Sequence, residues 1–224
     1  MLKTTKYDDS VQLLFENARS RQYPKHQIIC YQSDKLTEIY QIKSGFIKAY
    51  TILDSGDNRT LFLLSKGDIF PIAFSLTLDW DKYLVRYFYQ SMTDVEVDIL
   101  DHATFKQKIE EDSKKMTAYL AYMSASNQAM MNQLEVMKNK KAINKVAMLL
   151  PYLVAKCGEQ IAPHKYRLAL KLSHQEIADL SGVTRETTTT LIKQLKKDGT
   201  LEQKRSGWIV TIKPEDDGEE LFIG

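Results

Sequence analysis

Apolar and polar residues follow successive patterns along the chain, and each pattern predicts a different kind of element. Residues 1–20 place apolar side chains on one side of a predicted helix. From Ile28 to Leu100, apolar and polar residues alternate in short runs, which is typical of β-strands. Glycines spaced 11 residues apart allow tight corners between these runs: Gly45, Gly56 and Gly67. The segment therefore predicts a small antiparallel barrel or roll.

The periodicity becomes helical from residue 103 and then repeats every seven residues up to residue 137. One row consists of methionines and a second row follows it four residues later, so the predicted dimer interface comprises Met116, Leu120, Met123, Asn127, Met130, Leu134 and Met137. Such rows are the a and d positions of a coiled coil and predict a homodimer, and Asn127 at an a position favours a two-stranded pair. Alternatively, the same rows pack on the roll of their own chain.

Beyond a polar hinge at residues 138–141, a third region has the pattern of two short helices around a tight turn. Ser173 and Glu176 form a capping box that starts the first helix. Gly182 permits the positive φ of the turn, and Thr184 is a natural N-cap for the second helix. The apolar stripe of the second helix leaves one face open to solvent.

The open face of this second helix carries the side chains that suit base reading: Arg185, Glu186, Thr189 and Thr190. An α-helix fits the DNA major groove, where arginine binds guanine, glutamate accepts from cytosine, and threonine contacts a base or a thymine methyl group. The alternative is an ordinary helical hairpin with a solvated charged face. Residues 201–212 favour the first interpretation, because they predict two strands around a basic Lys-Arg-Ser-Gly turn that can lie along a phosphate backbone as a wing.

A second set of polar and basic residues around the two helices and the wing is expected to contact phosphates: Ser173, His174, Gln175, Thr184, Thr187, Lys193, Lys204 and Arg205. The distribution of charge agrees with this expectation. The whole chain of 224 residues has a net charge of +2, but residues 138–213 hold 15 Lys and Arg against 6 Asp and Glu. Such a concentrated positive region is what phosphate neutralisation requires. The acidic residues after it predict a solvated end.

These motifs carry a family resemblance. Residues 173–178 (SHQEIA) together with 184–193 (TRETTTTLIK) resemble the winged helix of the cyclic AMP receptor protein/FNR (CRP/FNR) superfamily of transcription regulators. The resemblance implies an α+β chain with a β-roll sensor domain at residues 1–102, a dimerisation helix at 103–138 and a winged helix-turn-helix domain at 139–224. In that family a further arginine usually stands where this chain has Thr190, so the usual operator sequence is not expected here.

The glycine spacing of the predicted roll, with Gly67-Asp68-Ile69-Phe70, resembles the sensor domain of the same superfamily. Family members that bind cyclic nucleotide have a Gly-Glu pair where this chain has Pro71-Ile72. Proline has no N–H to donate and isoleucine cannot accept from a ribose hydroxyl, which predicts an effector other than cyclic AMP. A candidate effector pocket comprises Phe70, Ile72, Arg86 and Tyr87. Alternatively, Arg86 simply faces outward.

Other features limit the chemistry that the chain is expected to perform. Cys30 and Cys157 form no C-x-x-C pair and the four histidines show no metal spacing, so no metal and no cofactor is predicted. The start of the chain lacks an apolar signal core, which predicts a cytoplasmic protein without membrane contact. Double-stranded DNA, a second copy of the chain and RNA polymerase are the expected partners. The alternatives are an effector-independent regulator, or a ligand-gated or redox enzyme attached to a DNA reader.

Overall fold

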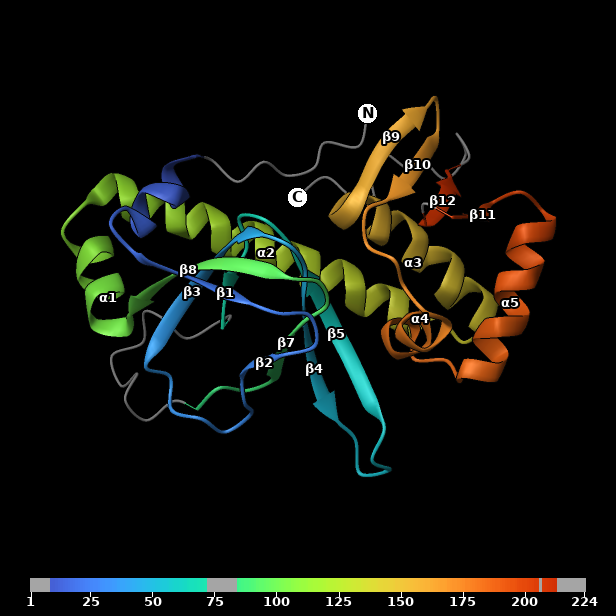
Figure 1. Ribbon diagram of the computed structural model, residues 1–224, viewed down its shortest axis with the longest axis horizontal. Helices are drawn as coiled ribbons and strands as arrows, with labels where there is room; N and C mark the ends of the chain where they lie inside the picture. Colours follow the sequence, from blue (N-terminus) through green and yellow to red (C-terminus); the bar gives the residue numbers. More distant parts are fainter. Residues whose placement is uncertain (1–8, 72–83, 206, 213–224) are drawn as a thin grey trace. The chain divides into compact units, whose positions relative to one another are not determined.

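The computed structural model describes residues 9–71, 84–205 and 207–212, except for the side chains at positions 9–10 and 132–137 (Figure 1). The chain forms two compact units, one made of Thr5–Asn127 and the other mainly of Gln128–Gly224. The long helix α2, Ser113–Lys138, contributes residues to both units. No helix of the described ranges combines the length and the apolar character needed to cross a membrane.

The first unit contains two antiparallel sheets, as the alternating pattern predicted. One sheet has the strand order β1-β8-β3-β6, formed by Arg19–Tyr23, Val95–Asp101, Glu38–Ser44 and Ile69–Phe70. The other has the order β2-β7-β4-β5, formed by Ile28–Cys30, Phe88–Ser91, Ile47–Ile52 and Asn58–Leu64. All three predicted corner glycines have positive φ. A β-carbon at Gly45 would also lie only 2.4 Å from the Asp94 carbonyl oxygen, so that corner requires glycine.

The predicted helix over residues 1–20 is wrong in its described part. Only the short 3-10 helix η1, Asp9–Phe15, forms there, and strand β1 begins at Arg19. Asn17 adopts a left-handed φ of 63°, which reverses the chain between the two elements. Strand β1 then pairs with β8 in a continuous register, and this long-range partner overrides the local helical pattern.

Aromatic rings fill the interior of the roll. Phe70 stacks on Tyr40 with ring centroids 4.9 Å apart and on Tyr89 with centroids 5.3 Å apart. Phe105 from helix α1 and Tyr122 from α2 join the same apolar core. Burial of this aromatic surface stabilises the unit.

The segment from 103 to 138 contains two helices rather than one. Helix α1, His102–Glu110, is capped by Asp101, whose carboxylate accepts from the Thr104 N–H at 2.9 Å. Asp112 accepts from the Lys114 N–H at 2.9 Å just before α2 begins, so a polar turn separates the helices. The single periodic stretch in the sequence concealed this interruption because both helices present apolar residues to the same core.

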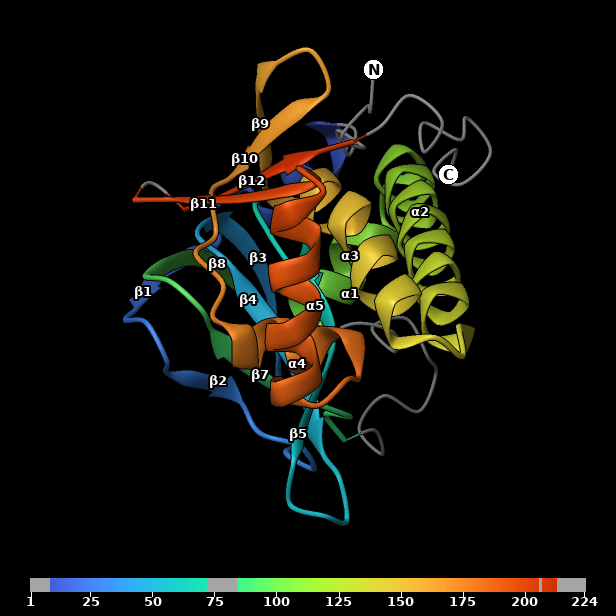
Figure 2. The ribbon, with the colours of Figure 1, turned by 90° about the vertical axis from the view of Figure 1, so that its right-hand side faces the viewer.

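The second unit has the predicted helix-turn-helix and wing. Its elements are α3 at Ala142–Cys157, β9 at Gly158–Ala162, β10 at Lys165–Leu168, α4 at His174–Ser181, α5 at Arg185–Lys197, β11 at Leu201–Lys204 and β12 at Gly207–Thr211. The strands form one sheet in the order β11-β12-β10-β9. Strand β9 was not predicted. Figure 2 shows α5 running between α4 and the wing strand β11, with which it makes contact.

Candidate nucleic-acid interface

Local hydrogen bonds fix where α4 begins and ends. The Ser173 hydroxyl accepts from the Glu176 N–H at 3.2 Å, and the Glu176 carboxylate accepts from the Ser173 N–H at 2.6 Å. These reciprocal bonds form the predicted capping box. At the other end Gly182 adopts a left-handed φ of 68°, and its N–H donates to the Ala178 carbonyl at 2.9 Å. The chain can therefore turn at once into α5.

Helix α5 is held by its N-cap and by one buried face. The Thr184 hydroxyl accepts from the Thr187 N–H at 3.3 Å, as an N-cap should. Thr188, Ile192 and Leu195 are buried on the inner face. The outer face therefore has to be polar, and the candidate DNA-contacting residues of α5 lie along it.

The side chains of the four predicted base readers differ in exposure and in hydrogen bonding. Arg185, Glu186 and Thr190 are exposed, whereas Thr189 is half-buried. The Thr190 hydroxyl donates to the Glu186 carbonyl at 3.2 Å, and the Thr189 hydroxyl donates to the Arg185 carbonyl at 2.9 Å. Both threonine hydroxyls are thus engaged with the helix backbone, whereas the two charged side chains extend into solvent.

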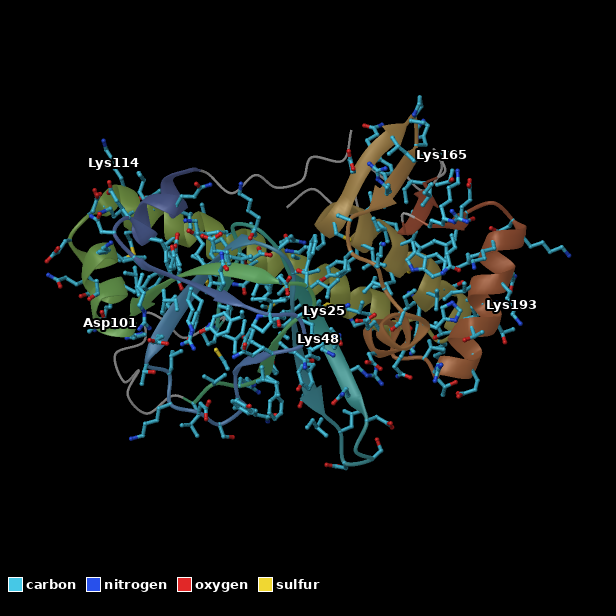
Figure 3. The ribbon with its side chains drawn as sticks, viewed as in Figure 1. Lys25, Lys48, Asp101, Lys114, Lys165 and Lys193 are labelled. Atoms are coloured by element: carbon cyan, nitrogen blue, oxygen red, sulfur yellow. The ribbon has the colours of Figure 1, made fainter. Side chains whose placement is uncertain are left out.

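Several predicted phosphate contacts have structural roles as well. Beyond the two hydroxyl caps, the Gln175 amide donates to Asp179 at 2.7 Å, and Thr187 accepts from the Thr184 hydroxyl at 2.9 Å. Lys193 lies on the exposed side of α5 (Figure 3).

The wing supplies the remaining predicted phosphate contacts. Lys204 and Arg205 are exposed beside its turn, and the Lys204 ammonium lies 3.7 Å from Glu202. Strands β11 and β12 pair from Leu201 to Gly207, so these cations project from a paired hairpin rather than from a loose loop.

The contacts that join the wing to α5 were not predicted. The Trp208 indole N–H donates to the Leu172 carbonyl at 2.7 Å. The Lys196 ammonium lies 4.9 Å from the Trp208 ring centroid and donates to the Gln203 amide oxygen at 2.7 Å. The only signal for this in the sequence is a tryptophan within the predicted wing, which indicates packing but not its partner. These contacts hold the wing against the helix that carries Arg185.

In the roll, the residues proposed for an effector pocket occupy different environments. Phe70 is 0% exposed within the aromatic stack, so it presents no surface to a ligand. Ile72 lies outside the described residues. Arg86 is exposed, and half-buried Tyr87 packs edge-on against Phe62 with ring centroids 5.8 Å apart.

The predicted dimer residues of α2 divide into two groups. Met116 and Met123 pack against the core of the roll, in line with the intramolecular alternative. Leu120 is 57% exposed and Asn127 is also exposed, while Met130 is half-buried. The side chains of Leu134 and Met137 lie outside the description. At least part of the predicted seam is therefore accessible.

The thiols do not resemble reactive sites. Cys30 and Cys157 are both buried and free. Burial raises the pKa of the Cys157 thiol to about 11 and raises the pKa of the Cys30 thiol as well, so both favour the unreactive neutral form. Within the described ranges, no group of three or more His, Cys, Asp or Glu side chains could hold a metal ion.

Comparison with known proteins agrees with this geometry. A family model for the cyclic nucleotide-binding domain matches residues 20–112, and one for the Crp-like helix-turn-helix domain matches residues 144–216. The chain belongs to the CRP/FNR family of transcription regulators. As a CRP/FNR-type regulator it carries a helix-turn-helix DNA-binding domain, formed here by α4 and α5.

Relatives of this CRP/FNR regulator include the HTH-type transcriptional regulator ArcR of Staphylococcus haemolyticus, 24% identical over 85% of this chain and 81% of the relative. The fumarate and nitrate reduction regulatory protein of Vibrio cholerae is 25% identical over 87% of this chain and 74% of the relative. Among solved structures, FixK2 from Bradyrhizobium japonicum has a TM-score of 0.73 at 20% identity, covering 88% of this chain and 94% of FixK2. A CooA mutant from Carboxydothermus hydrogenoformans has a TM-score of 0.71 at 21% identity, covering 99% and 96%. The structural likeness confirms the CRP-like fold.

Proposed function

We propose that this regulator binds DNA as a homodimer and reads an inverted-repeat operator, with one α5 helix in each of two successive major grooves. The observation that carries the proposal is the exposed N-terminal turn of α5, where Arg185 and Glu186 follow the N-cap Thr184. A helix held in this way can present its first turn to base edges without fraying.

The proposal divides the surface into readers and positioners. Arg185, Glu186, Thr189 and Thr190 read bases. The residues that hold the protein on phosphates are Ser173, His174, Gln175, Thr184, Thr187, Lys193, Lys204 and Arg205. In support, Arg185 and Lys193 are exposed, and within the described residues neither forms an ion pair that would compete with DNA.

The dimeric part of the proposal rests on α2. Leu120 is 57% exposed, and burial of this apolar side chain against a second copy of α2 would be favourable. Exposed Asn127 would pair with its counterpart in that copy. Two-fold symmetry would then place the two α5 helices about 34–36 Å apart along the DNA, which is the spacing of an inverted repeat.

We further propose that the effector, where one acts, is not cyclic AMP. Buried Pro71 follows Phe70 at the place where a donor and a ribose acceptor would be needed. A second candidate is a regulator without any small effector, and the complete burial of Phe70 between two tyrosines favours it. In both forms the protein performs no catalytic step. It works on the chromosome, and therefore in the cytoplasm, with RNA polymerase as a further partner.

Selection of bound duplexes from a random DNA pool tests the proposal. We expect the purified protein to enrich an inverted repeat whose half-sites are about 10 base pairs apart, centre to centre. A Leu120→Glu variant serves as the control, because a buried charge should weaken the dimer and reduce selection to single half-sites. Enrichment of unrelated sequences with equal affinity would contradict the proposal. A thermal-shift screen with small metabolites then separates the two candidates, because only a sensor gains stability.

A further inference from the structure

A hydrogen bond joins the first residue of α4 to the middle of α5. The Nδ1 atom of His174 lies 3.0 Å from the hydroxyl oxygen of Thr189, which is one of the proposed base readers. The same hydroxyl lies 2.9 Å from the carbonyl oxygen of Arg185, one turn earlier in α5. Thr189 is half-buried, so this contact lies at the boundary between the domain interior and the DNA-facing surface.

The two contacts of Thr189 determine where the protons are. A carbonyl oxygen only accepts, so the single hydroxyl proton of Thr189 has to point to Arg185. The hydroxyl oxygen must then accept from the ring of His174, which assigns a proton to Nδ1 of that ring. The Thr189 hydroxyl is therefore occupied by these two partners. The methyl group is the part of the side chain that remains available to contact a base.

The imidazole ring is held in place from two sides. Its centroid lies 6.0 Å from that of Trp208, and the indole N–H of Trp208 is anchored on the Leu172 carbonyl at 2.7 Å. The charged groups that face the ring among the described residues are Arg185 and Lys196, both from α5, while strand β12 contributes the uncharged indole. The position of His174 is therefore fixed by the wing as well as by α5.

We propose that His174 is a positioning residue that holds the Thr189 hydroxyl inward, so that Thr189 reads a thymine through its methyl group rather than a base through its hydroxyl. This rests on the proposed function, in which α5 enters the major groove. Contact with a thymine methyl group is one of the recognised ways in which threonine distinguishes base pairs. His174 thereby determines which group of Thr189 contacts the base. This role is additional to the proposed contact of His174 itself with a phosphate.

The same arrangement links DNA binding to pH. With Nδ1 donating to Thr189, the neutral ring presents Nε2 only as an acceptor, and phosphate oxygens also only accept. A phosphate contact by His174 therefore requires a second proton. Burial, followed by the nearby charges of Lys196 and Arg185, lowers the pKa of His174 in the free protein, which leaves that proton off near neutrality. DNA affinity is thus expected to rise as the pH falls, by at most about tenfold per pH unit for one linked proton.

Two matched substitutions at position 189 test the readout. Thr189→Val keeps the methyl group and removes the hydroxyl, whereas Thr189→Ser keeps the hydroxyl and removes the methyl group. After the operator position that responds to Thr189→Ala has been found, we expect Thr189→Val to retain the preference for thymine there. Thr189→Ser should reduce that preference about fourfold, the value of one buried methyl group. The opposite ranking would overturn the proposal.

Substitution of His174 tests its positioning role. His174→Ala should weaken the preference for thymine at the same position and flatten the pH dependence of affinity between about pH 5.5 and 8. His174→Asn, whose amide also donates, should restore part of the base preference but not the pH dependence. An unchanged preference and an unchanged pH profile in both variants would overturn the proposal. Should the unmodified protein select no DNA sequence at all, the proposed function fails instead, so the two failures are distinguishable.

Discussion

Aromatic side chains lie at the centre of both units, but they are connected in different ways. In the roll, Phe70 is stacked between Tyr40 and Tyr89 with no exposed surface. In the DNA-binding unit, Trp208 is nearly as buried, yet its indole N–H is bonded to Leu172 and its face carries the ammonium of Lys196. In the first arrangement the Phe70 ring itself supplies only packing. The second also fixes the position of residues proposed to face DNA, so the same kind of substitution should have different consequences in the two units.

Charged residues of the described ranges differ in whether they are paired within the protein. Ion pairs connect neighbouring strands in both units, as between Lys43 and Asp98 in the roll and between Arg167 and Glu159 in the DNA-binding unit. In the described part of the DNA-binding unit, Arg185 and Lys193 form no such pair. Exposed ion pairs contribute little to stability, whereas exposed cations without a protein partner remain available to phosphates and bases. Substitutions in the roll are therefore best tested by measuring stability, and substitutions of these exposed cations by measuring DNA binding.

The largest expected effect is the loss of the aromatic stack. Phe70→Ala would leave a cavity between two tyrosine rings, and we expect the free energy of unfolding of the roll to fall by about 3–5 kcal/mol. Urea unfolding followed by circular dichroism measures the change. Tyr87→Ala is the matched control, because Tyr87 is only half-buried and its substitution should lower the free energy of unfolding by less. Equal losses for the two variants would show that the stack is not the centre of the fold.

A smaller loss is expected where one hydroxyl group holds a strand edge. The Tyr122 hydroxyl accepts from the Ile69 N–H at 2.8 Å and donates to the Ile69 carbonyl at 3.2 Å, and Ile69 belongs to β6 at the edge of its sheet. Tyr122→Phe would leave both buried backbone groups without this partner, at a cost of about 1–3 kcal/mol.

Hydrogen exchange measures this effect directly, because the Ile69 amide should lose protection in Tyr122→Phe. Tyr31→Phe provides the control, since Tyr31 is exposed and its substitution should change the stability by less than about 0.5 kcal/mol. Unchanged protection at Ile69 would mean that this polar link between α2 and β6 does not stabilise the roll. The contrast between a purely packed roll and a polar DNA-binding unit would then become sharper.

In the DNA-binding unit, we expect substitution of a base reader to reduce the preference for the operator over random duplex. Arg185→Ala should weaken binding to the selected operator by about 1–3 kcal/mol while changing binding to random duplex much less. Lys204→Ala should weaken both by similar factors and reduce the salt dependence by about one counterion, because it removes one proposed phosphate contact. Titrations of both duplexes at several salt concentrations compare the two. Equal losses on both duplexes for Arg185→Ala would remove the distinction between readers and positioners.

Features held by residues close together in the sequence were predictable, whereas those held by residues far apart in the sequence were not. The start of α4 was predicted to the residue, since Ser173 and Glu176 bond across three positions. The same holds for the turn at Gly182 and the cap at Thr184. The bond between Trp208 and Leu172 spans 36 positions, and that between His174 and Thr189 spans 15. Such partners depend on how the elements pack, which periodicity does not specify.

The roll shows the same limit. Its alternating strands and its corners were predictable because side-chain alternation and glycine spacing are local. The environment of Phe70 was not, because β6 has only two residues and offers no alternation from which its inner face can be inferred. Strand β1 was also missed, since its exposed polar residues are held by pairing with β8, more than 70 residues away along the chain.

The smallest expected effect is the loss of stability on removal of a helix cap, and its pH dependence should differ between the two units. Asp101 caps α1 of the roll with a carboxylate, and its hydrogen bond to Thr104 holds the pKa of that carboxyl below its ordinary value. A lowered pKa means that the stabilisation is complete above the unfolded-state pKa and disappears as the pH falls through the lower folded-state pKa. Thr184 caps α5 with a hydroxyl that does not titrate.

Asp101→Asn should therefore remove a pH-dependent contribution, whereas Thr184→Ala should remove a constant one of about 1 kcal/mol. Urea unfolding between about pH 2 and 7 measures both. The difference in stability between the unmodified protein and Asp101→Asn should shrink toward zero at the acidic end, because a protonated Asp101 has no charge left to lose. The difference for Thr184→Ala should stay level over the same range. A level difference for Asp101→Asn would mean that its oxygen, and not its charge, caps α1, so that the helices of both units would be held by the same kind of bond.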